Sequence, residues 1–208
     1  MKRISLLAAL VLVFIQFGCL KSPDYDQLSS EFVVTTNTDS ATNFSTLKTY
    51  YISDSITYIQ NGTDSIIKDA SSQKLVDAVK ANMTARGFTF VPKGSKPNIG
   101  VMMGIAKNTY VGVIYSGWWD AYAGWWDPWY WGWYYPYYYP WSVAYTVTTG
   151  SVIVTMVDLK NPAVSNTLRI IWTGFMGGAV GDNLATNVDR GVNSINQAFA
   201  QSPLVKTN

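Results

Sequence analysis

The sequence predicts an α+β domain: a mostly antiparallel or mixed sheet with two helices packed on it, plus an aromatic-rich insertion loop. Three observations support this fold class. Short β-branched and aromatic runs typical of strands follow one another with few helices between them. Residues 71–86 and 184–199 repeat apolar side chains at helical spacing. Consecutive strands joined by short turns favour an α+β sandwich over a doubly wound sheet.

The first 18 residues have the pattern of an export signal. Lys2 and Arg3 precede the apolar run of residues 4–17, which is shorter than the roughly 20 residues that a membrane-spanning helix needs. The run ends at Gly18, directly before Cys19, which is the single cysteine of the chain. A lone cysteine in this place resembles a bacterial lipoprotein signal, in which Cys19 becomes the acylated first residue.

Alternatives to lipidation stay open, because Gln16 and Phe17 stand where such signals usually have a leucine and a small residue. They are an ordinary cleaved signal with an incidental cysteine, or an uncleaved anchor. Lipidation is preferred, since an odd exported cysteine otherwise leaves a reactive thiol. It predicts a lipid-anchored protein of the outer membrane, facing the periplasm or the cell surface, with the membrane as its first partner.

The charge balance argues against a nucleic-acid partner. Once Lys2 and Arg3 leave with the signal, 13 basic residues face 13 acidic ones, and no basic run remains in the sequence. Nucleic-acid binding depends on clustered positive charge. Because the chain has no second cysteine, its stability must come from the core rather than from a disulfide.

A polar tether is expected over residues 19–43, and the domain over residues 44–200. The β-branched and aromatic run of residues 44–52 predicts the first strand. Asn61-Gly62 is a turn dipeptide, so the segments on either side of it are able to pair as a small hairpin. The hairpin segments are residues 55–59 and 63–67.

The first helix is predicted over residues 71–86. Asp69 or Ser71 is placed to cap its start, and Gly87 suits a left-handed end. One stripe of this helix is apolar: Leu75, Val76, Val79 and Met83. Strands are then expected over residues 88–91, 98–106 and 110–115.

The second half of the domain starts with the strongest strand signal, SVIVTMVDL within residues 143–159. Apolar residues occupy both of its faces, as in a central strand that is covered on both sides. Asn161-Pro162 predicts a turn, and residues 168–175 the paired strand. Asp182 is placed to cap the last helix, and residues 201–208 are expected to form a tail. The apolar stripe of this helix is Leu184, Val188, Val192, Ile195 and Phe199.

Residues 117–141 are the most unusual stretch of the chain. They hold eight of the nine Trp and seven of the fourteen Tyr, and no Lys, Arg, Leu, Ile or Val. Pro128, Pro136 and Pro140 interrupt any helix or sheet ladder. Large rings separated by such breakers predict an aromatic loop that projects from the domain.

Several short motifs outside this loop carry a family resemblance. They are Phe-Ser-x-x-Lys-Thr-Tyr at 44–50, Arg-Gly-Phe at 86–88, Lys-Pro-Asn-Ile-Gly-Val at 96–101, Gly-Ser-Val-Ile-Val at 150–154 with Asp158, and Ile-Trp-Thr-Gly at 171–174. With the closing helix, about three quarters of the chain resembles the bacterial lipoprotein family catalogued as domain of unknown function 4136. Members often carry a Gly/Trp/Tyr-rich insertion where this chain has residues 117–141, and usually an Asp where it has Asn98. The resemblance implies an exported lipoprotein with an α+β domain, and no activity.

The composition excludes several chemistries. The chain has no histidine, which removes Ser-His-Asp and Cys-His pairs, imidazole acid–base catalysis and most zinc or copper sites. The glycines of residues 174–181 lack the Lys-Ser/Thr of a phosphate loop and predict a turn. We therefore expect a non-enzymatic protein with no metal site and no cofactor.

Asp120 and Asp127 are the remaining candidate pair, since they are the only acids between Asp77 and Asp158 and both lie among tryptophans. Two carboxylates at the right separation are able to hydrolyse a glycosidic bond. Turn formation is the simpler interpretation, because Asp127 precedes a proline. Catalysis is therefore not predicted.

Four uses of the aromatic loop stay open. Its rings are able to pack on an open sheet face, contact a protein partner, stack on a glycan or peptidoglycan, or enter the lipid headgroup region. The candidate binding residues are Trp118, Trp119, Trp125, Trp126, Trp129, Trp131, Trp133, Asp120 and Asp127.

Outside the loop, Trp172 is expected in the core, with Thr173 and Arg169 on the other face of the strand. Arg169, Asp158 and Arg190 are expected as surface or rim charges. The sequence thus predicts a non-enzymatic, lipid-anchored envelope protein whose aromatic loop packs on the domain or contacts an envelope partner. The alternative is a glycan- or peptidoglycan-binding module that uses stacked Trp and Tyr with Asp120 and Asp127.

Overall fold

The computed structural model of the chain describes residues 32–60, 63–107, 110–111, 135–136, 145–146, 150–163, 167–181 and 183–208. Glu31–Asn208 forms one compact unit. Its described apolar side chains, from Phe44 to Val205, make one continuous core. A unit with its own core is what independent folding requires.

Nine strands of the described residues form one mixed sheet in the order β1-β11-β10-β6-β2-β5, with β3, β4 and β8 attached at its sides. They are β1 (Val33–Thr38), β2 (Thr49–Ile52), β3 (Ile56–Gln60), β4 (Thr63–Ile67), β5 (Thr89–Phe90), β6 (Ile99–Lys107), β8 (Tyr135–Pro136), β10 (Ser151–Ala163) and β11 (Thr167–Gly177). A separate antiparallel pair joins β7 (Tyr110–Val111) and β9 (Tyr145–Thr146). The predicted α+β fold with a mixed sheet is confirmed.

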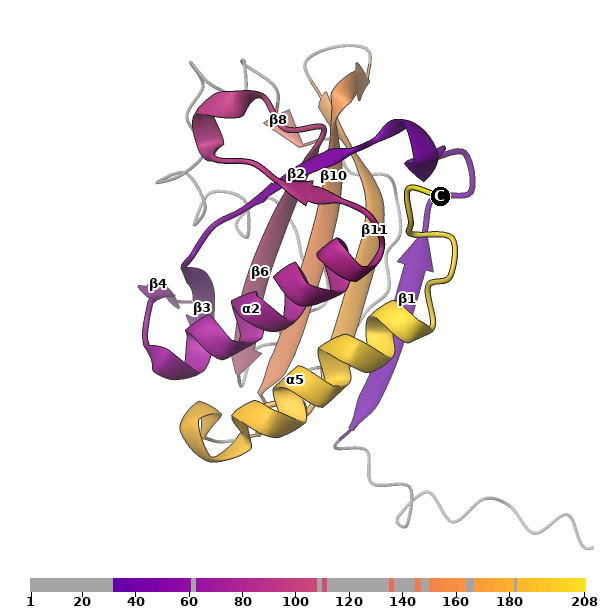
Figure 1. Cartoon of the computed structure of the whole chain (residues 1–208). Helices are drawn as coiled ribbons and strands as arrows, with labels where there is room; N and C mark the ends of the chain where they lie inside the picture. Colours follow the sequence, from indigo (N-terminus) through magenta and orange to yellow (C-terminus); the bar gives the residue numbers. More distant parts are fainter. Residues whose placement is uncertain are drawn as a thin grey trace, which may run out of the picture. The chain divides into compact units, whose positions relative to one another are not determined.

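β10 is the central strand. It pairs antiparallel with β11 on one side and with β6 on the other (Figure 1). β2 and β3 run parallel to the two halves of β6, and β3 and β4 form the predicted hairpin. β1 pairs antiparallel with β11, from Val33 opposite Gly177 to Thr38 opposite Trp172.

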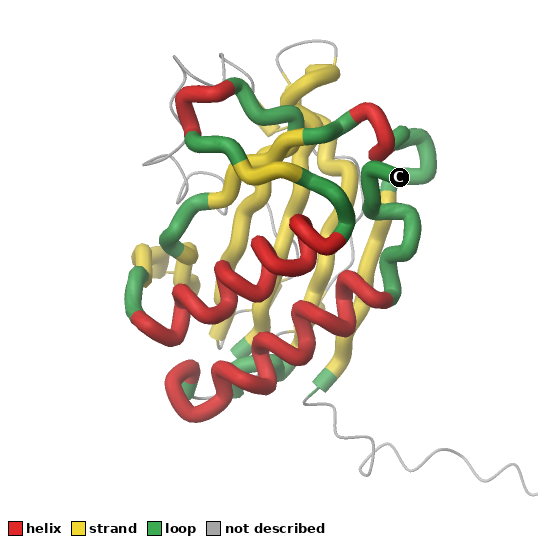
Figure 2. Tube along the Cα trace, in the orientation of Figure 1, coloured by secondary structure: helices red, strands yellow, loops and turns green. Residues whose placement is uncertain are grey.

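Two helices, α2 (Ala70–Ala85) and α5 (Leu184–Ala200), lie side by side across one face of the sheet (Figure 2). Asp69 caps α2, as predicted, and Gly87 ends it with a φ of 84°. The N-cap of α5 is Asn183, which corrects the prediction of Asp182; Asp182 itself lies outside the described residues. The amide oxygen of Asn183 accepts from the backbone N–H of Thr186, as an aspartate in that place would.

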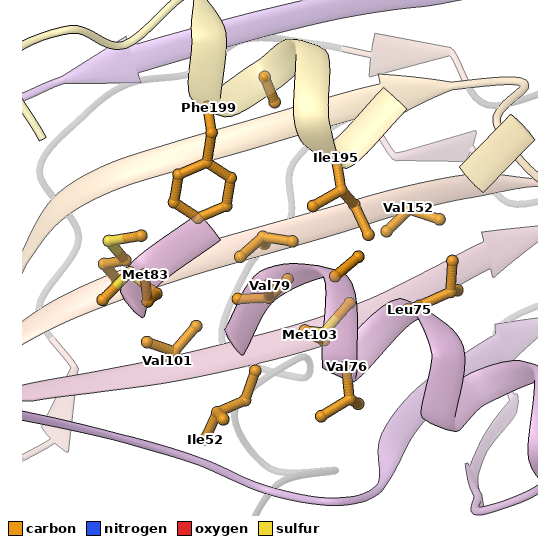
Figure 3. Close-up of a cluster of buried hydrophobic side chains, with 14 of the residues drawn as sticks. Ile52, Leu75, Val76, Val79, Met83, Val101, Met103, Val152, Ile195 and Phe199 are labelled. Carbon is orange, nitrogen blue, oxygen red and sulfur yellow. The ribbon is translucent and has the colours of Figure 1, made fainter. Parts of the chain in front are cut away.

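The predicted apolar stripes of the two helices pack against the sheet and against each other. Leu75, Val76, Val79 and Met83 are fully buried, and Ile195 and Phe199 of α5 pack into the same cluster (Figure 3). Trp172 is 1% exposed, which confirms it as a core residue.

Three boundaries differ from the sequence-based expectation. The turn expected at Asn161-Pro162 lies within β10, which continues to Ala163. Val33–Thr38, expected within the tether, is an edge strand. It binds β11 through backbone hydrogen bonds and packs little more than Val34 on the core. Its Thr- and Asn-rich sequence therefore lacks the apolar pattern that would predict a strand. The strand expected over residues 44–52 begins only at Thr49, after the 3₁₀ turn η1 (Phe44–Thr46) that Asn43 caps. A second 3₁₀ turn, η2 (Lys93–Ser95), precedes β6.

Candidate functional site

The functional residues predicted from the sequence lie outside the described residues. These are Cys19, Trp118, Trp119, Trp125, Trp126, Trp129, Trp131, Trp133, Asp120 and Asp127. The lipid anchor and the binding role of the aromatic loop therefore stay predictions. Of the loop itself the structure describes Tyr135–Pro136, which is strand β8; the expectation that Pro136 interrupts a sheet ladder is wrong, because it lies opposite Leu168 of β11. The described part of the chain instead reveals a buried apolar surface on the sheet.

That surface is the far face of the sheet, the face opposite the two helices. Along β10 the side chains alternate: Val154 belongs to the core under the helices, whereas Ile153 and Thr155 point the other way. The far face is defined by six side chains of three neighbouring strands: Met102, Ala106, Ile153, Thr155, Val157 and Phe175.

The far face is apolar and shielded from water. Met102, Ile153 and Val157 are each 1% exposed, and Phe175 is 5% exposed. None of them belongs to the core cluster under the helices. Both helices of the described residues lie on the opposite face (Figure 1). A face of this composition is covered by something other than α2 and α5.

Three short strands are described between β6 and β10, and one of them, β8, pairs with the sheet. β7 follows β6 and pairs with β9, at the end of the sheet where Ala106 lies opposite Ser151. β8 pairs with Thr167 and Leu168, at the opposite end. Since a strand rises about 3.3 Å per residue, these ends are roughly 25 Å apart.

An ion cluster, of which Asp158 is the buried member, closes the end of the sheet near β8. Asp158 is fully buried and lies 3.3 Å from Nη2 of Arg169, whose Nη1 lies 3.4 Å from Asp39. The prediction of Asp158 as a surface or rim charge is therefore wrong, and Arg169 turns from the expected far face toward this pair. The reason is a β-bulge in β11 between Ile170 and Trp172, which shifts the alternation.

The ion cluster has the chemistry of a structural site. One carboxylate oxygen of Asp158 accepts the backbone N–H groups of Lys160 and Asn161 at 2.9 and 2.8 Å, and the other accepts the Asn161 amide at 3.1 Å. Both oxygens are thus committed to hydrogen bonds, as is usual for buried polar groups, which lose their water partners on folding. A carboxylate held in this way positions a turn and has no free oxygen for a substrate.

The C-terminal residues, expected as a tail, are a second missed feature. Trp172 Nε1 donates to Ser202 Oγ at 2.8 Å, and the ring of Trp172 lies 5.0 Å from that of Phe199. Val205 is fully buried. The signal in the sequence was the serine, which supplies the partner that a buried indole N–H needs.

The shifted pKa values also belong to structural groups. The backbone N–H of Ser72 lowers the pKa of Asp69 at the start of α2, and a hydrogen bond from Lys68 lowers the pKa of Asp54. Burial raises the pKa of Tyr50. Each shift follows from a cap, an ion pair or the core.

The described residues hold neither a cluster of metal ligands nor a helix suited to a bilayer. No group of three or more His, Cys, Asp or Glu side chains in these ranges is placed to hold a metal ion. Within the same part of the chain, no helix has the length and apolarity needed to cross a membrane.

Comparisons with known proteins agree with the fold. A comparison with curated proteins found no match. A solved structure of a DUF4136 family protein from Bacteroides thetaiotaomicron is similar to this chain with 29% identity and a TM-score of 0.68, over 86% of this chain and 99% of that one.

Two more distant structures share less. A PDZ domain protein from Parabacteroides distasonis has 14% identity and a TM-score of 0.43, over 82% of this chain and 35% of that one. A PelC dodecamer from Paraburkholderia phytofirmans has 11% identity and a TM-score of 0.37, over 85% of this chain and 99% of that one.

The profile described as "Domain of unknown function (DUF4136)" matches residues 34–204, which include β1 from Val34 onward and the first half of the C-terminal residues 201–208. The match thus covers both helices of the described residues and, apart from Val33, every strand of the sheet. The chain belongs to the DUF4136 family.

Proposed function

We propose that this chain is a non-enzymatic, lipid-anchored protein of the cell envelope, and that residues 117–141 cover the far face of its sheet while presenting outward rings to an envelope partner. One observation carries the proposal. The far face is apolar and buried, yet both described helices lie on the other side of the sheet.

The course of the chain supports this covering. It must pass between the β7–β9 pair and β8, at opposite ends of the sheet. The helix face is already occupied by α2 and α5, and β1 pairs with the outer edge of β11. The far face is the remaining direct path between these two ends.

The chemistry of the two surfaces also matches. Trp and Tyr bury large apolar areas while their N–H and O–H groups reach water, which suits a cover with one dry side and one wet side. Burying an apolar side chain contributes about 1.5–3 kcal/mol. Residues 117–141 and the sheet would then stabilise each other. The rings of this segment that face the solvent would form a contact surface for a partner.

Thiol protection tests the covering directly. In a Cys19→Ser chain, Thr155→Cys places a thiol on the far face and Val154→Cys places one on the helix face. We expect both to react slowly with a maleimide. Replacing residues 117–141 with a short Gly-Ser linker should accelerate the reaction at position 155 at least tenfold and leave position 154 slow. Rapid labelling of Thr155→Cys in the otherwise intact chain would disprove the covering.

The proposed binding of an envelope partner by the outward rings of residues 117–141 is tested by tryptophan fluorescence with vesicles and with purified peptidoglycan fragments. A shift that disappears when residues 117–141 are replaced would identify the ligand class of the loop. If neither ligand shifts the fluorescence, the partner of the solvent-facing rings is a protein. Lipidation is tested separately, by the mass of the N-terminal peptide in the wild-type and Cys19→Ser proteins expressed in a bacterium.

A further inference from the structure

Five cations that are far apart in the sequence gather at one end of the domain. This basic end consists of Lys48, Arg86, Lys96, Lys160 and Lys206. They come from the start of β2, the end of α2, the turn after η2, the last part of β10 and the C-terminal segment. The sequence has no basic run, so the cluster exists only in the folded chain.

Hydrogen bonds between these segments establish their proximity. Lys48 Nζ donates to the carbonyl oxygen of Thr207 at 2.9 Å, and the N–H of Thr207 donates to the carbonyl oxygen of Arg86 at 3.0 Å. The amide oxygen of Asn98, two residues after Lys96, accepts from the N–H of Lys48 at 2.9 Å.

The remaining cations are tied to the same end. Lys160 Nζ donates to the carbonyl oxygen of Thr46 at 2.9 Å, and Thr46 lies two residues before Lys48. Lys206 directly precedes Thr207, whose main chain links Lys48 to Arg86. The four lysines are all exposed and Arg86 is half-buried.

The described side-chain carboxylates near this end are fewer than the cations. Asp39 and Asp158 share one partner, Arg169, so these three residues together carry a net charge of −1. Away from this end, Lys68 pairs with Asp54. The basic end therefore carries an excess of positive charge that the described aspartates beside it do not cancel.

An apolar side chain stands among these cations. Leu204 is 69% exposed, the most exposed of the large apolar residues in the described ranges. Its neighbours Ser202 and Val205 are buried, and Ser202 is fixed by its bond to Trp172. The C-terminal segment thus holds Leu204 outward next to Lys206, at the end of the domain where the C-terminus lies (Figure 1).

We propose that the basic end docks on a bilayer surface rich in anionic phospholipid, with Leu204 entering the headgroup region and the lysines near the phosphates. Lysines act as point charges on flexible stems and need no fixed ligand geometry, which suits a fluid layer of headgroups. Basic side chains around an exposed apolar one are typical of interfacial binding. This contact depends neither on a lipid at Cys19 nor on residues 117–141, which lack Lys and Arg.

The test is vesicle co-sedimentation of the chain from Glu31 onward, with phosphatidylglycerol-containing and pure phosphatidylcholine vesicles. Each lysine near an anionic surface contributes about a fivefold change in binding. We expect the Lys96→Gln, Lys206→Gln double variant to bind the anionic vesicles roughly 25-fold more weakly. The matched control, Lys68→Gln with Lys74→Gln, removes the same charge elsewhere and should bind within about threefold of wild type.

Two further measurements separate a bilayer from a soluble polyanion. Leu204→Ser should weaken vesicle binding severalfold without changing retention on heparin, and 0.5 M salt should release the protein from vesicles, because the screening length then falls well below the about 8 Å of physiological salt. The proposal is overturned by equal binding to neutral vesicles, by equal effects of the two lysine pairs, or by no effect of Leu204→Ser. Circular dichroism of each variant shows whether it is folded, and the exposed positions make unfolding unexpected.

Discussion

Both faces of the sheet bury apolar side chains, but α2 and α5 cover only one of them. Met102 and Met103 are neighbours on β6, and each is 1% exposed. Met103 belongs to the core under α2 and α5, whereas Met102 points to the far face. Helices of regular period cover one face, and we propose that an aromatic, proline-broken segment covers the other.

This difference shows that equal burial need not imply equal dependence on the same cover. A side chain under the helices should lose its stabilising effect only when the helices leave. A side chain on the far face should lose it when residues 117–141 are removed. The following predictions rank the effects that test this contrast, from the largest to the smallest.

Trp172→Ala should give the largest loss. The indole is 1% exposed, packs on Phe199 and donates to Ser202, so we expect a loss of about 3–5 kcal/mol in the free energy of unfolding. Urea titration followed by far-UV circular dichroism measures it. The loss should be the same when residues 117–141 are replaced by a linker; a much smaller loss in that background would mean that both faces depend on the loop.

The methionine pair makes the comparison sharpest. In the intact chain, Met102→Ala and Met103→Ala should each cost about 2–5 kcal/mol, since both remove a buried side chain of the same size. In the linker variant, Met103→Ala should keep its cost and Met102→Ala should fall below about 0.5 kcal/mol. Equal costs of the two substitutions in the linker variant would show that the far face is covered by another part of the chain.

Two glycines test how tightly each face is packed. A Cβ at Gly174 would lie 2.7 Å from the Trp172 ring, which is fixed in the core, so Gly174→Ala should cost about 1–3 kcal/mol. A Cβ at Gly100, on the far-face side of β6, would lie 3.0 and 3.1 Å from the ends of Val157 and Leu159. These side chains can yield, so Gly100→Ala should cost less than Gly174→Ala in parallel thermal melts; the reverse order would contradict the ranking.

Asp69→Ala should have the smallest effect, a loss of about 1 kcal/mol in the free energy of unfolding. It removes the cap of α2 but no side chain that packs on either face of the sheet. The folded state lowers the pKa of Asp69, so its contribution is present above the pKa of the unfolded chain and is lost as pH falls through the folded value. The difference between wild type and Asp69→Ala should therefore shrink in acid, below about pH 4. A difference that grows on acidification would reject the cap as its cause.

The sequence by itself determined much of the fold. Periodic apolar residues placed α2 and α5, Asn61-Gly62 placed the β3–β4 hairpin, and the two-sided apolar run around Val154 identified the central strand. These features depend on local rules, such as helical spacing, turn dipeptides and the alternation of strands. The absence of histidine likewise excluded catalysis and metal binding by histidine side chains before any fold was known.

Only the tertiary structure decided the features that join distant segments. β1 is held by backbone bonds to β11, so its Thr-rich sequence gave no apolar signal. Asp158 is buried because a bulge and a turn bring Arg169 and two N–H groups to it. The basic end joins five segments whose charges are isolated in the sequence. Such features depend on which segments meet in space, and composition or period along the chain does not record those meetings.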